Sequence, residues 1–395
     1  MRLPVRAATA ALIALTTAFS AGTAWSADTP EPTPAPLHTA VDAVPGQYIV
    51  TLETGVDAAR AAHKLGLKPS FVYTSALHGF AAPMTALQLT AARITPGVKS
   101  VEEDARVQAV PMPASPAGGR APASSWGLDR IDQKLLPLDG EFTTHGSGAG
   151  VSAYILDSGI DYGHPEFGGR AVPGFDAIGD GRNGQDCRGH GTHVAGTVGG
   201  ATHGVARKAS LVSVRVLGCD GAGSWSGIIA GMDWVAKNAR QPAVLNASLG
   251  GERSQALNSA ATALSGAGVV TIVAAGNSAA DACNISPASA QRVTTVGATD
   301  RYDQETAFSN HGPCLSLYAP GQAIVSAKLG GGSTAQNGTS MAAPHVTGVA
   351  ALYRASHPEA GPAAVREWLE SRSTKDVVTN LSTGSPNRLL FTADL

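Results

Sequence analysis

The pattern of apolar and polar positions changes along the chain, and its larger C-terminal part predicts an α/β domain. From Trp126 onward, short runs of consecutive apolar residues alternate with longer stretches of helical periodicity. Continuous apolar runs are typical of parallel strands that helices cover on both faces. The predicted strands are residues 151–156, 211–216, 244–249, 269–274, 293–297 and 315–318, and the predicted helices are residues 190–198, 226–239, 254–265 and 340–355. We therefore expect a doubly wound α/β domain.

A smaller unit precedes this domain. Residues 47–52, 79–84 and 98–102 have the pattern of strands, and residues 56–65 and 85–94 that of helices, which together predict an α+β unit folded over about residues 45–110. Residues 28–36 alternate proline with polar residues and predict a linker. Prolines and glycines cluster between Pro111 and Gly119 and disfavour both helix and strand. We place the domain boundary there, near Arg120.

The N-terminus has the pattern of an export signal. Arg2 and Arg6 supply positive charge, and residues 7–19 form an apolar stretch too short to span a bilayer. A buried core helix is the alternative. Small residues favour cleavage after Ser26 or after Ala24, so we expect a signal peptide at residues 1–26 and a secreted product. An extracellular chain folds under oxidising conditions, in which its four cysteines can form disulfides in any of three pairings.

The composition argues against several classes of function. Lys and Arg number 28 against 30 Asp and Glu, which gives a net charge of −2 and no basic signature of a nucleic-acid-binding protein. The one long apolar run is the N-terminal one, so we expect no membrane association once the signal is removed. A hydrophobic content of 43% is too high for a disordered chain. The cysteines also lack the paired spacing of a zinc site.

Four polar side chains stand at predicted ends of strands or helices, where α/β domains place their functional sites. Asp157 and Asn277 each end a strand, His190 starts a helix between two glycines, and Ser340 starts the last predicted helix. Three of them have a simpler explanation as well. Many strands end in Asp, Asn often forms turns, and Thr339 or Ser340 can merely cap its helix.

Taken together, these residues predict an acyl-transfer site. A nucleophilic serine needs an adjacent base, and that base needs an orienting acid. Ser340 at a helix N-terminus would hold an anionic intermediate near backbone N–H groups, and Asn277 can donate to the oxyanion. We expect the first helical turn to tolerate Pro344. The alternative is a metal bound by His190 and His193, one helical turn apart, although no nearby cluster supplies further ligands.

The sequences around Asp157, His190 and Ser340 resemble the three signature motifs of the subtilisin-like serine peptidases, in particular the proteinase K and aqualysin branch. The resemblance extends from residue 125 to about residue 381. It implies a three-layer α/β subtilisin-like domain with a mostly parallel sheet over residues 121–395. It also implies that Ser340 is the nucleophile, that His190 is the general base and then acid, and that Asp157 orients the imidazole. Asn277 and the Ser340 N–H would bind the oxyanion.

The resemblance further implies a cleft in which substrate binds as an added strand. The two edges of the cleft match Ser224, Trp225, Ser226 and Gly227 on one side and Ser248, Leu249, Gly250 and Gly251 on the other. The walls of the pocket are uncharged at Gly250, Gly251, Ala274, Ala275 and Gly276, which implies a preference for apolar or aromatic residues before the cut. Trp225 would reshape a neighbouring subsite or else be an ordinary surface aromatic.

The preceding α+β unit resembles the inhibitory propeptide of these peptidases, with a ferredoxin-like fold. The motifs that carry this resemblance are residues 45–50, 79–82 and 98–102. A family propeptide assists folding, lays its tail in the cleft and is then removed, here by a cut between about Val110 and Ala123. High-contact-order parallel sheets fold slowly, which gives such assistance a physical purpose. The chain's own propeptide would be an intramolecular inhibitor, and proteins or peptides the substrates.

The cysteines and one group of acidic residues fit further features of this family. The aqualysin-like arrangement implies disulfides that pair Cys187 with Cys219 and Cys283 with Cys314. Catalysis needs no cofactor, but a structural calcium ion would be held by oxygen ligands near the mature N-terminus. The candidate ligands are Asp129, Asp132, Gln133, Asp139 and Glu141, with solvated surface acids as the alternative. Ser316 replaces an aspartate that often ligates a second calcium in the family.

These observations favour a secreted, monomeric serine endopeptidase of broad specificity, made as a proenzyme that processes itself. A peptidase of the same fold with narrow, processing specificity is one alternative. A catalytically silent binding protein is another, but binding alone does not require all four polar residues together. A lipase or esterase normally carries its serine between two glycines, whereas Thr339 and Met341 flank Ser340.

Overall fold

The computed structural model describes residues 33–109, 125–393 and 395. Residues 34–395 form one compact unit, which contains all the described helices and strands. The predicted signal peptide, most of the linker and the predicted boundary near Arg120 lie outside the described residues. None of the helices in the described part of the chain combines the length and hydropathy that a membrane span needs.

Residues 34–109, called here the N-terminal segment, form the predicted α+β arrangement. Its strands pair in one sheet, and both helices begin at side-chain caps. Asp57 accepts the backbone N–H of Arg60 at the start of α1, and Thr85 with Gln88 forms a capping box at the start of α2. The elements are β1 (Leu37–His38), β2 (Ala43–Leu52), α1 (Ala58–Lys64), β3 (Phe71–Tyr73), β4 (Gly79–Pro83), α2 (Ala86–Arg93) and β5 (Val98–Ala109).

The folded part of this segment begins before the predicted residue 45. Ala35 donates a backbone hydrogen bond to Arg93, and β1 pairs in parallel with β5. The prolines of the predicted linker therefore do not keep its last residues from packing. β5 is also longer than predicted, because its residues 106–109 pair with strands outside the segment.

Residues 125–395, called here the large domain, are built on a nine-stranded sheet. In spatial order its strands are β18 (Thr374–Lys375), β19 (Arg388–Leu389), β15 (Leu317–Pro320), β14 (Thr294–Thr299), β12 (Val270–Ala274), β10 (Ala243–Ala247), β6 (Ser152–Asp157), β8 (Ser210–Arg215) and β7 (Ala171–Asp176). All neighbours pair in parallel except the edge pair β18 and β19. The predicted α/β fold is confirmed.

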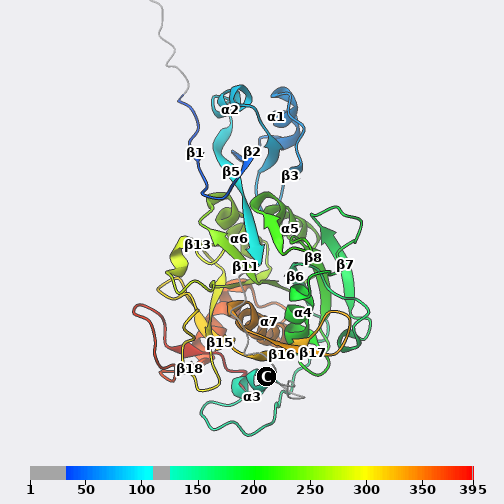
Figure 1. Ribbon diagram of the computed structural model, residues 1–395, viewed down its shortest axis with the longest axis vertical. Coiled ribbons are helices and arrows are strands. Elements are labelled where there is room, and N and C mark those ends of the chain that lie inside the picture. The colour runs from blue at the N-terminus through cyan, green and yellow to red at the C-terminus, as the bar shows by residue number, and fades with distance from the viewer. Residues whose placement is uncertain (1–32, 110–124, 394) are drawn as a thin grey trace, which may run out of the picture. The chain divides into compact units, whose positions relative to one another are not determined.

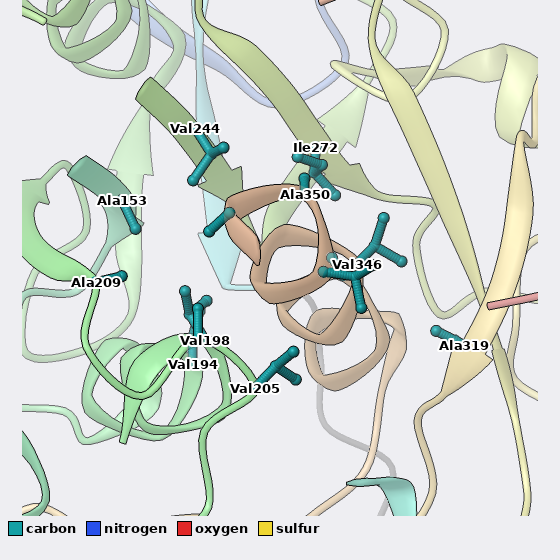
Figure 2. Packing of buried hydrophobic residues seen from close by; sticks show 14 of the residues in the cluster. Ala153, Val194, Val198, Val205, Ala209, Val244, Ile272, Ala319, Val346 and Ala350 are labelled. Carbon is teal, nitrogen blue, oxygen red and sulfur yellow. The ribbon is translucent and has the colours of Figure 1, made fainter. Parts of the chain in front are cut away.

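Alternate residues of the central strands enter two separate cores, which makes the domain three-layered. In β6, Ala153 and Ile155 join the core under α4 (His190–Gly199) and α7 (Thr339–Ser356). Tyr154 and Leu156 face the opposite core, under α5 (Trp225–Asn238) and α6 (Gln255–Gly266). Figure 2 shows α7 surrounded by buried side chains from the strands and from α4. Because both faces are covered, the strands read as continuous apolar runs.

Several shorter elements lack a clear sequence pattern. They are α3 (Trp126–Ile131), β9 (Ala222–Ser224), β11 (Leu249–Glu252), β13 (Ile285–Ser286), β16 (Ile324–Ala327), β17 (Ser333–Gln336) and α8 (Pro362–Arg372). The predicted strand 244–249 was too long, since β10 ends at Ala247 and β11 leaves the sheet to pair with β5 and β13. β7 was missed because Pro173 and Gly174 interrupt it, which an edge strand with a register shift tolerates.

Candidate active site

Asp157 and His190 meet where β6 ends and α4 begins. Asp157 is the last residue of β6 and His190 is the first of α4. The carboxylate Oδ1 of Asp157 lies 2.7 Å from Nδ1 of His190, and both side chains are almost completely buried. Gly191 permits this close packing, because a Cβ there would lie 2.1 Å from the carbonyl oxygen of Gly159.

The environment of His190 favours a charged imidazole. Burial lowers the pKa of His190, but the charge of Asp157 and its hydrogen bond outweigh burial, so the pKa lies above its ordinary value. Among the described residues, Nε2 of His190 has no hydrogen-bond partner. An imidazole anchored at Nδ1 and unbonded at Nε2 can accept a proton at Nε2.

Ser340 occupies the second position of α7, next to the sharp turn at Gly338. Gly338 is the N-cap, with φ of 141°, and α7 has no side-chain cap. The interpretation of Thr339 or Ser340 as a simple capping residue is therefore wrong, because both lie inside the helix. The Ser340 hydroxyl is buried and donates to the carbonyl of Ser248 at 3.2 Å. Such bonds in free enzymes often rearrange when substrate binds.

Pro344 lies beyond the first turn of α7, contrary to our expectation. It is the sixth helical residue, so it removes the N–H that would bond the carbonyl of Ser340. The hydroxyl of Ser248 bonds that carbonyl instead, at 2.8 Å. Ser248 is itself held by the side-chain amide of Asn246 at 2.8 Å. A neighbouring loop thus satisfies the backbone group that the proline leaves without a helical donor.

Asn277 follows β12 and lies beside the start of α7. Its Oδ1 accepts hydrogen bonds from the backbone N–H and the hydroxyl of Thr339, at 2.9 and 2.8 Å. The hydroxyl of Thr339 also accepts the N–H of Gly276 at 3.0 Å. These bonds fix which end of the amide is oxygen. The amide nitrogen lies toward Gly338, where an added Cβ would be 2.8 Å from it.

The structure does not support metal binding by His190 and His193. The Nε2 atom of His193 is 3.0 and 3.1 Å from the carbonyls of Ile324 and Thr334, while His190 is bonded to Asp157. Burial lowers the pKa of His193 to about 3, so its imidazole is neutral. Nowhere in the described ranges do three or more His, Cys, Asp or Glu side chains gather as a group able to hold a metal ion.

The cleft that was predicted to bind substrate as an added strand lies between β9 and β11, and β5 of the N-terminal segment is inserted there. Leu249 and Gly250 pair antiparallel with Ala109 and Gln108. On its other edge, β5 pairs antiparallel with β9, through residues 106–108 and 222–224. Figure 1 shows β5 extending from the region of α1 and α2 to β11. The segment thus occupies the position in which an added strand was predicted to bind.

One predicted edge is strand only at its first residue. Of residues 224–227, only Ser224 belongs to β9. Ser224 also caps α5, which begins directly after it, by accepting the N–H of Gly227 at 3.1 Å. Trp225, Ser226 and Gly227 therefore belong to the helix. Trp225 is 1% exposed, so it is not a surface aromatic while the segment is bound, and its effect on a subsite stays a prediction. The predicted wall residues Ala274, Ala275 and Gly276 do lie beside Asn277, at the end of β12.

Carboxylates bind the N-terminal segment to the large domain at three helical positions. Asp104 accepts the N–H and the hydroxyl of Ser226, at 3.0 and 2.5 Å, at the start of α5. Glu102 accepts the N–H of Ala256 at the start of α6, at 3.0 Å. In the opposite direction, Asp233 of α5 accepts backbone N–H groups of residues 74–76, at 2.7 to 3.0 Å. Helix N-termini favour negative charge, whereas burial raises the pKa of both Asp104 and Glu102.

Two disulfides join the cysteines in the arrangement that the resemblance implied. Cys187 is bonded to Cys219 and Cys283 to Cys314. Each closes a loop of about 30 residues, for which a chain-entropy estimate gives roughly 3–4 kcal/mol of stabilisation. Arg215 donates toward both sulfurs of the first disulfide and binds Asp180 through two hydrogen bonds. The segment that precedes His190 is thus tied to the end of β8.

The residues predicted to bind calcium form a hydrogen-bonded loop. Asp129 accepts backbone N–H groups of Asp139 and Gly140, and Asp132 accepts that of Thr143. Gln133 donates to two carbonyls of the same loop, and Asp139 accepts the N–H of Glu141. Burial, with Asp139 nearby, raises the pKa of both Asp129 and Asp132. Among the described residues no group of three or more His, Cys, Asp or Glu side chains is arranged to hold a metal ion, so calcium here stays a prediction.

Sequence reasoning missed the groups that hold the main side chains in place. The hydroxyl of Ser248 bonds the Ser340 carbonyl, and that of Thr339 bonds Asn277. On the other side of the site, Ser158 donates to both Asp157 and Asp186. A signal for Asp186 was available: the helix that starts at His190 has glycine at its N-cap and so needs a capping group from elsewhere.

Comparison with known proteins matches both parts of the chain. Residues 148–389 match the Subtilase family, and residues 59–109 match the Peptidase inhibitor I9 family. An extracellular serine proteinase of Thermus sp. (strain Rt41A) is 47% identical over 381 residues, covering 89% of this chain and 91% of that protein. A cuticle-degrading protease of Metarhizium anisopliae is 40% identical over 370 residues, covering 91% of this chain and 93% of that protein.

A solved structure is also similar. The crystal structure of a cold-adapted subtilisin-like serine proteinase is 48% identical to this chain, with a TM-score of 0.67. The match covers 69% of this chain and 99% of that one. Identity at this level over nearly the whole of that chain supports a common family as well as a common fold.

Proposed function

Because the chain belongs to the Subtilase family of serine proteases and carries an I9 inhibitor segment, we propose that it is a secreted endopeptidase that uses Asp157, His190 and Ser340. The observation that carries this assignment is the 2.7 Å contact between Asp157 and His190, together with the buried position of Ser340 at the start of α7. A buried acid–base pair of this kind and a serine at a helix N-terminus are the groups that acyl transfer requires.

The proposed reaction proceeds in two halves. The oxygen of Ser340 attacks the carbonyl carbon of the scissile peptide as Nε2 of His190 takes the hydroxyl proton. His190 then gives that proton to the departing amine, which leaves an ester on Ser340. Water then attacks the ester as His190 takes a proton from it, the bond to the Ser340 oxygen breaks, His190 returns the proton to that oxygen, and the carboxylic acid product leaves. Asp157 holds the imidazole tautomer at Nδ1 and stabilises its cation through the 2.7 Å contact.

Asn277 and the N-terminus of α7 would stabilise the negative charge on the carbonyl oxygen. The two bonds from Thr339 fix Oδ1 of Asn277 as the acceptor end of the amide, and its nitrogen is the end that would donate to an oxyanion. The backbone N–H of Ser340, the second residue of α7, is the second proposed donor, since the first N–H groups of a helix have no partner within it.

The inserted strand β5 supports both inhibition and substrate binding by strand addition. Its pairing with β9 and β11 is antiparallel on both edges, and a substrate in the same place would gain the same main-chain bonds. We propose that the N-terminal segment inhibits the enzyme until it is removed. We also propose a preference for apolar or aromatic residues before the cut, because the residues predicted to line the pocket carry no charge.

Secretion, self-processing and a monomeric state complete the proposal. The pattern of residues 1–26 and the disulfides support export, and a relative is named as an extracellular enzyme. The second candidate, a processing peptidase of narrow specificity, would need charged or selective groups along the cleft edges. Gly250 and Gly251 on β11 offer none, whereas Glu252 at the end of that strand is charged.

Hydrolysis of a chromogenic Ala-Ala-Pro-Phe peptide tests the proposal. The secreted wild-type chain should cleave it and show a mature mass near that of residues 121–395, and Ser340→Ala should do neither. Ser265→Ala is the matched control, because Ser265 is also buried, in α6, and its hydroxyl has no partner within the described residues. A correctly processed but inactive wild type would contradict broad specificity and favour the narrow processing peptidase or a silent binder.

A further inference from the structure

Asp186 is a buried carboxylate in the turn before α4, four residues before His190. It is 4% exposed and accepts five hydrogen bonds. Oδ1 accepts from the backbone N–H groups of Arg188 and Gly189, both at 2.9 Å, and from the hydroxyl of Ser158 at 3.0 Å. Oδ2 accepts from the N–H of Thr192 at 2.9 Å and from its hydroxyl at 2.6 Å. A carboxylate bonded in this way is held in one orientation.

These bonds fix the backbone that carries His190. Gly189 is the N-cap of α4 and has no side chain to satisfy the first N–H groups of the helix. Asp186 supplies that acceptor from outside the helix, since Thr192 is the third residue of α4. His190 lies between Gly189 and Thr192, both of which donate to Asp186, so this carboxylate holds the backbone on both sides of His190.

A bridge through Ser158 connects Asp186 to Asp157. The hydroxyl of Ser158 donates to Asp186 and accepts the N–H of Gly191 at 3.0 Å. The backbone N–H of Ser158 donates to Oδ1 of Asp157 at 2.7 Å, and the same oxygen contacts His190. Ser158 therefore holds the carboxylate that orients the imidazole, and is itself held by Asp186.

Charged and titratable groups act on His190 from β6, the preceding turn and α4. Asp157 and Asp186 are negative and favour the imidazolium, whereas Arg188 opposes it. His193, the remaining neighbour, has its pKa lowered to about 3 mainly by burial and is neutral. Two carboxylates thus act against one guanidinium at the residue that would become positive during the reaction.

We propose that Asp186 is a positioning residue for the reaction: it fixes the turn that carries His190, orients Asp157 through Ser158, and adds a second negative charge near the imidazolium. This inference rests on the proposed function, because a positioned imidazolium matters only if His190 is the catalytic base. Asp186 contacts neither Ser340 nor the inserted strand in any described hydrogen bond, so its effect is exerted through other residues.

A titration that needs no turnover tests the inference. Full-length Ser340→Ala chain, labelled with ¹⁵N at histidine, is titrated by NMR, and the His190 signal is identified by its loss in His190→Gln. Asp186→Asn should lower the pKa of His190 by roughly half a pH unit, as expected for removing one charge several Å away. Ser158→Ala keeps that charge and should leave the pKa nearly unchanged.

Kinetics on the active chain give the second readout. Asp186→Asn should move the acid limb of the kcat/KM profile to lower pH. Ser158→Ala should lower kcat without moving the limb or KM. If the pKa of His190 is unchanged in a folded Asp186→Asn chain, the charge effect is overturned. If kcat is unchanged in Ser158→Ala, the orienting effect is overturned, and this second test holds even when Asp186→Asn does not fold. An inactive wild type with the expected titration shift contradicts the proposed function alone.

Discussion

The contact between Ser248 and Ser340 allows a quantitative test of how the start of α7 is held. Pro344 removes the helical donor for the Ser340 carbonyl, and the Ser248 hydroxyl supplies a replacement at 2.8 Å. Because Ser340 and Ser248 are both fully buried, Ser248→Ala leaves this carbonyl without a donor. The expected loss in free energy of unfolding is about 1–3 kcal/mol, the cost of an unsatisfied buried polar group.

A double-mutant cycle separates this bond from the other contacts of Ser248. Pro344→Ala restores a backbone N–H four residues after Ser340, which can bond the same carbonyl within the helix. In that background, Ser248→Ala should cost less, with a coupling energy of about 1 kcal/mol or more. Asn246 loses the same contact in both backgrounds, so its contribution cancels.

Urea unfolding of the four chains measures the cycle. All carry Ser340→Ala to prevent autolysis, which removes the hydroxyl of residue 340 and keeps its carbonyl. The midpoint and slope of each transition give the free energies, provided that the transitions are two-state. Equal costs of Ser248→Ala with and without Pro344 would show that the Ser248 hydroxyl does not replace the missing helical donor.

Three further predictions concern the oxyanion donor, the inhibitory contact and acid stability. Asn277→Ala should lower kcat by about 10²–10³-fold, as the loss of one oxyanion donor does in subtilisin, with little change in KM. Steady-state kinetics that show a change in KM alone would contradict this prediction. Asp104→Ala in a separately added fragment of residues 27–120 should weaken its inhibition of the mature enzyme by about 5- to 30-fold, the equivalent of a lost helix cap. Glu103→Ala is the control, since Glu103 binds Ala40 within the segment, and equal inhibition constants for the two variants would contradict the role of the cap. Burial lowers the pKa of His193 to about 3 and that of His345 to about 4. Below a pH of about 6.5, these histidines therefore take up protons in the unfolded chain but not in the folded one. For each histidine, the free energy of unfolding should fall by about 1.4 kcal/mol per unit that the pH drops. His345 contributes to this loss down to about pH 4 and His193 down to about pH 3. Urea unfolding at several pH values checks this, and a loss that persists unchanged in His193→Gln and His345→Gln would contradict it.

The sequence predicted the elements that carry the site because they follow strong patterns. Asp157, His190 and Ser340 each adjoin a long apolar or small-residue run, and the runs correspond to β6, α4 and α7. Parallel strands that end at one edge of the sheet then bring distant residues together. The family resemblance named their roles, which a pattern of apolar residues alone does not contain.

Other features depend on contacts that a linear pattern does not record. Trp225 follows a serine and has polar neighbours, yet it is buried in a core that also contains Ala105 and Val107 of the N-terminal segment. The donor to the Ser340 carbonyl lies 92 residues away, at Ser248. The helix α8 buries only Val365 and Leu369, so it lacks a full apolar face. Such elements are set by tertiary packing.

Covalent labelling asks whether Ser340 is the activated nucleophile, on which the proposed function depends. The mature wild-type enzyme is treated with a serine-directed fluorophosphonate, and the modified residue is identified by intact mass and peptide mapping. We predict one adduct per molecule, on Ser340, with loss of peptidase activity in proportion to labelling, and no adduct in Ser340→Ala or His190→Ala. An adduct on another serine, or full activity in a chain labelled at Ser340, would contradict the assignment.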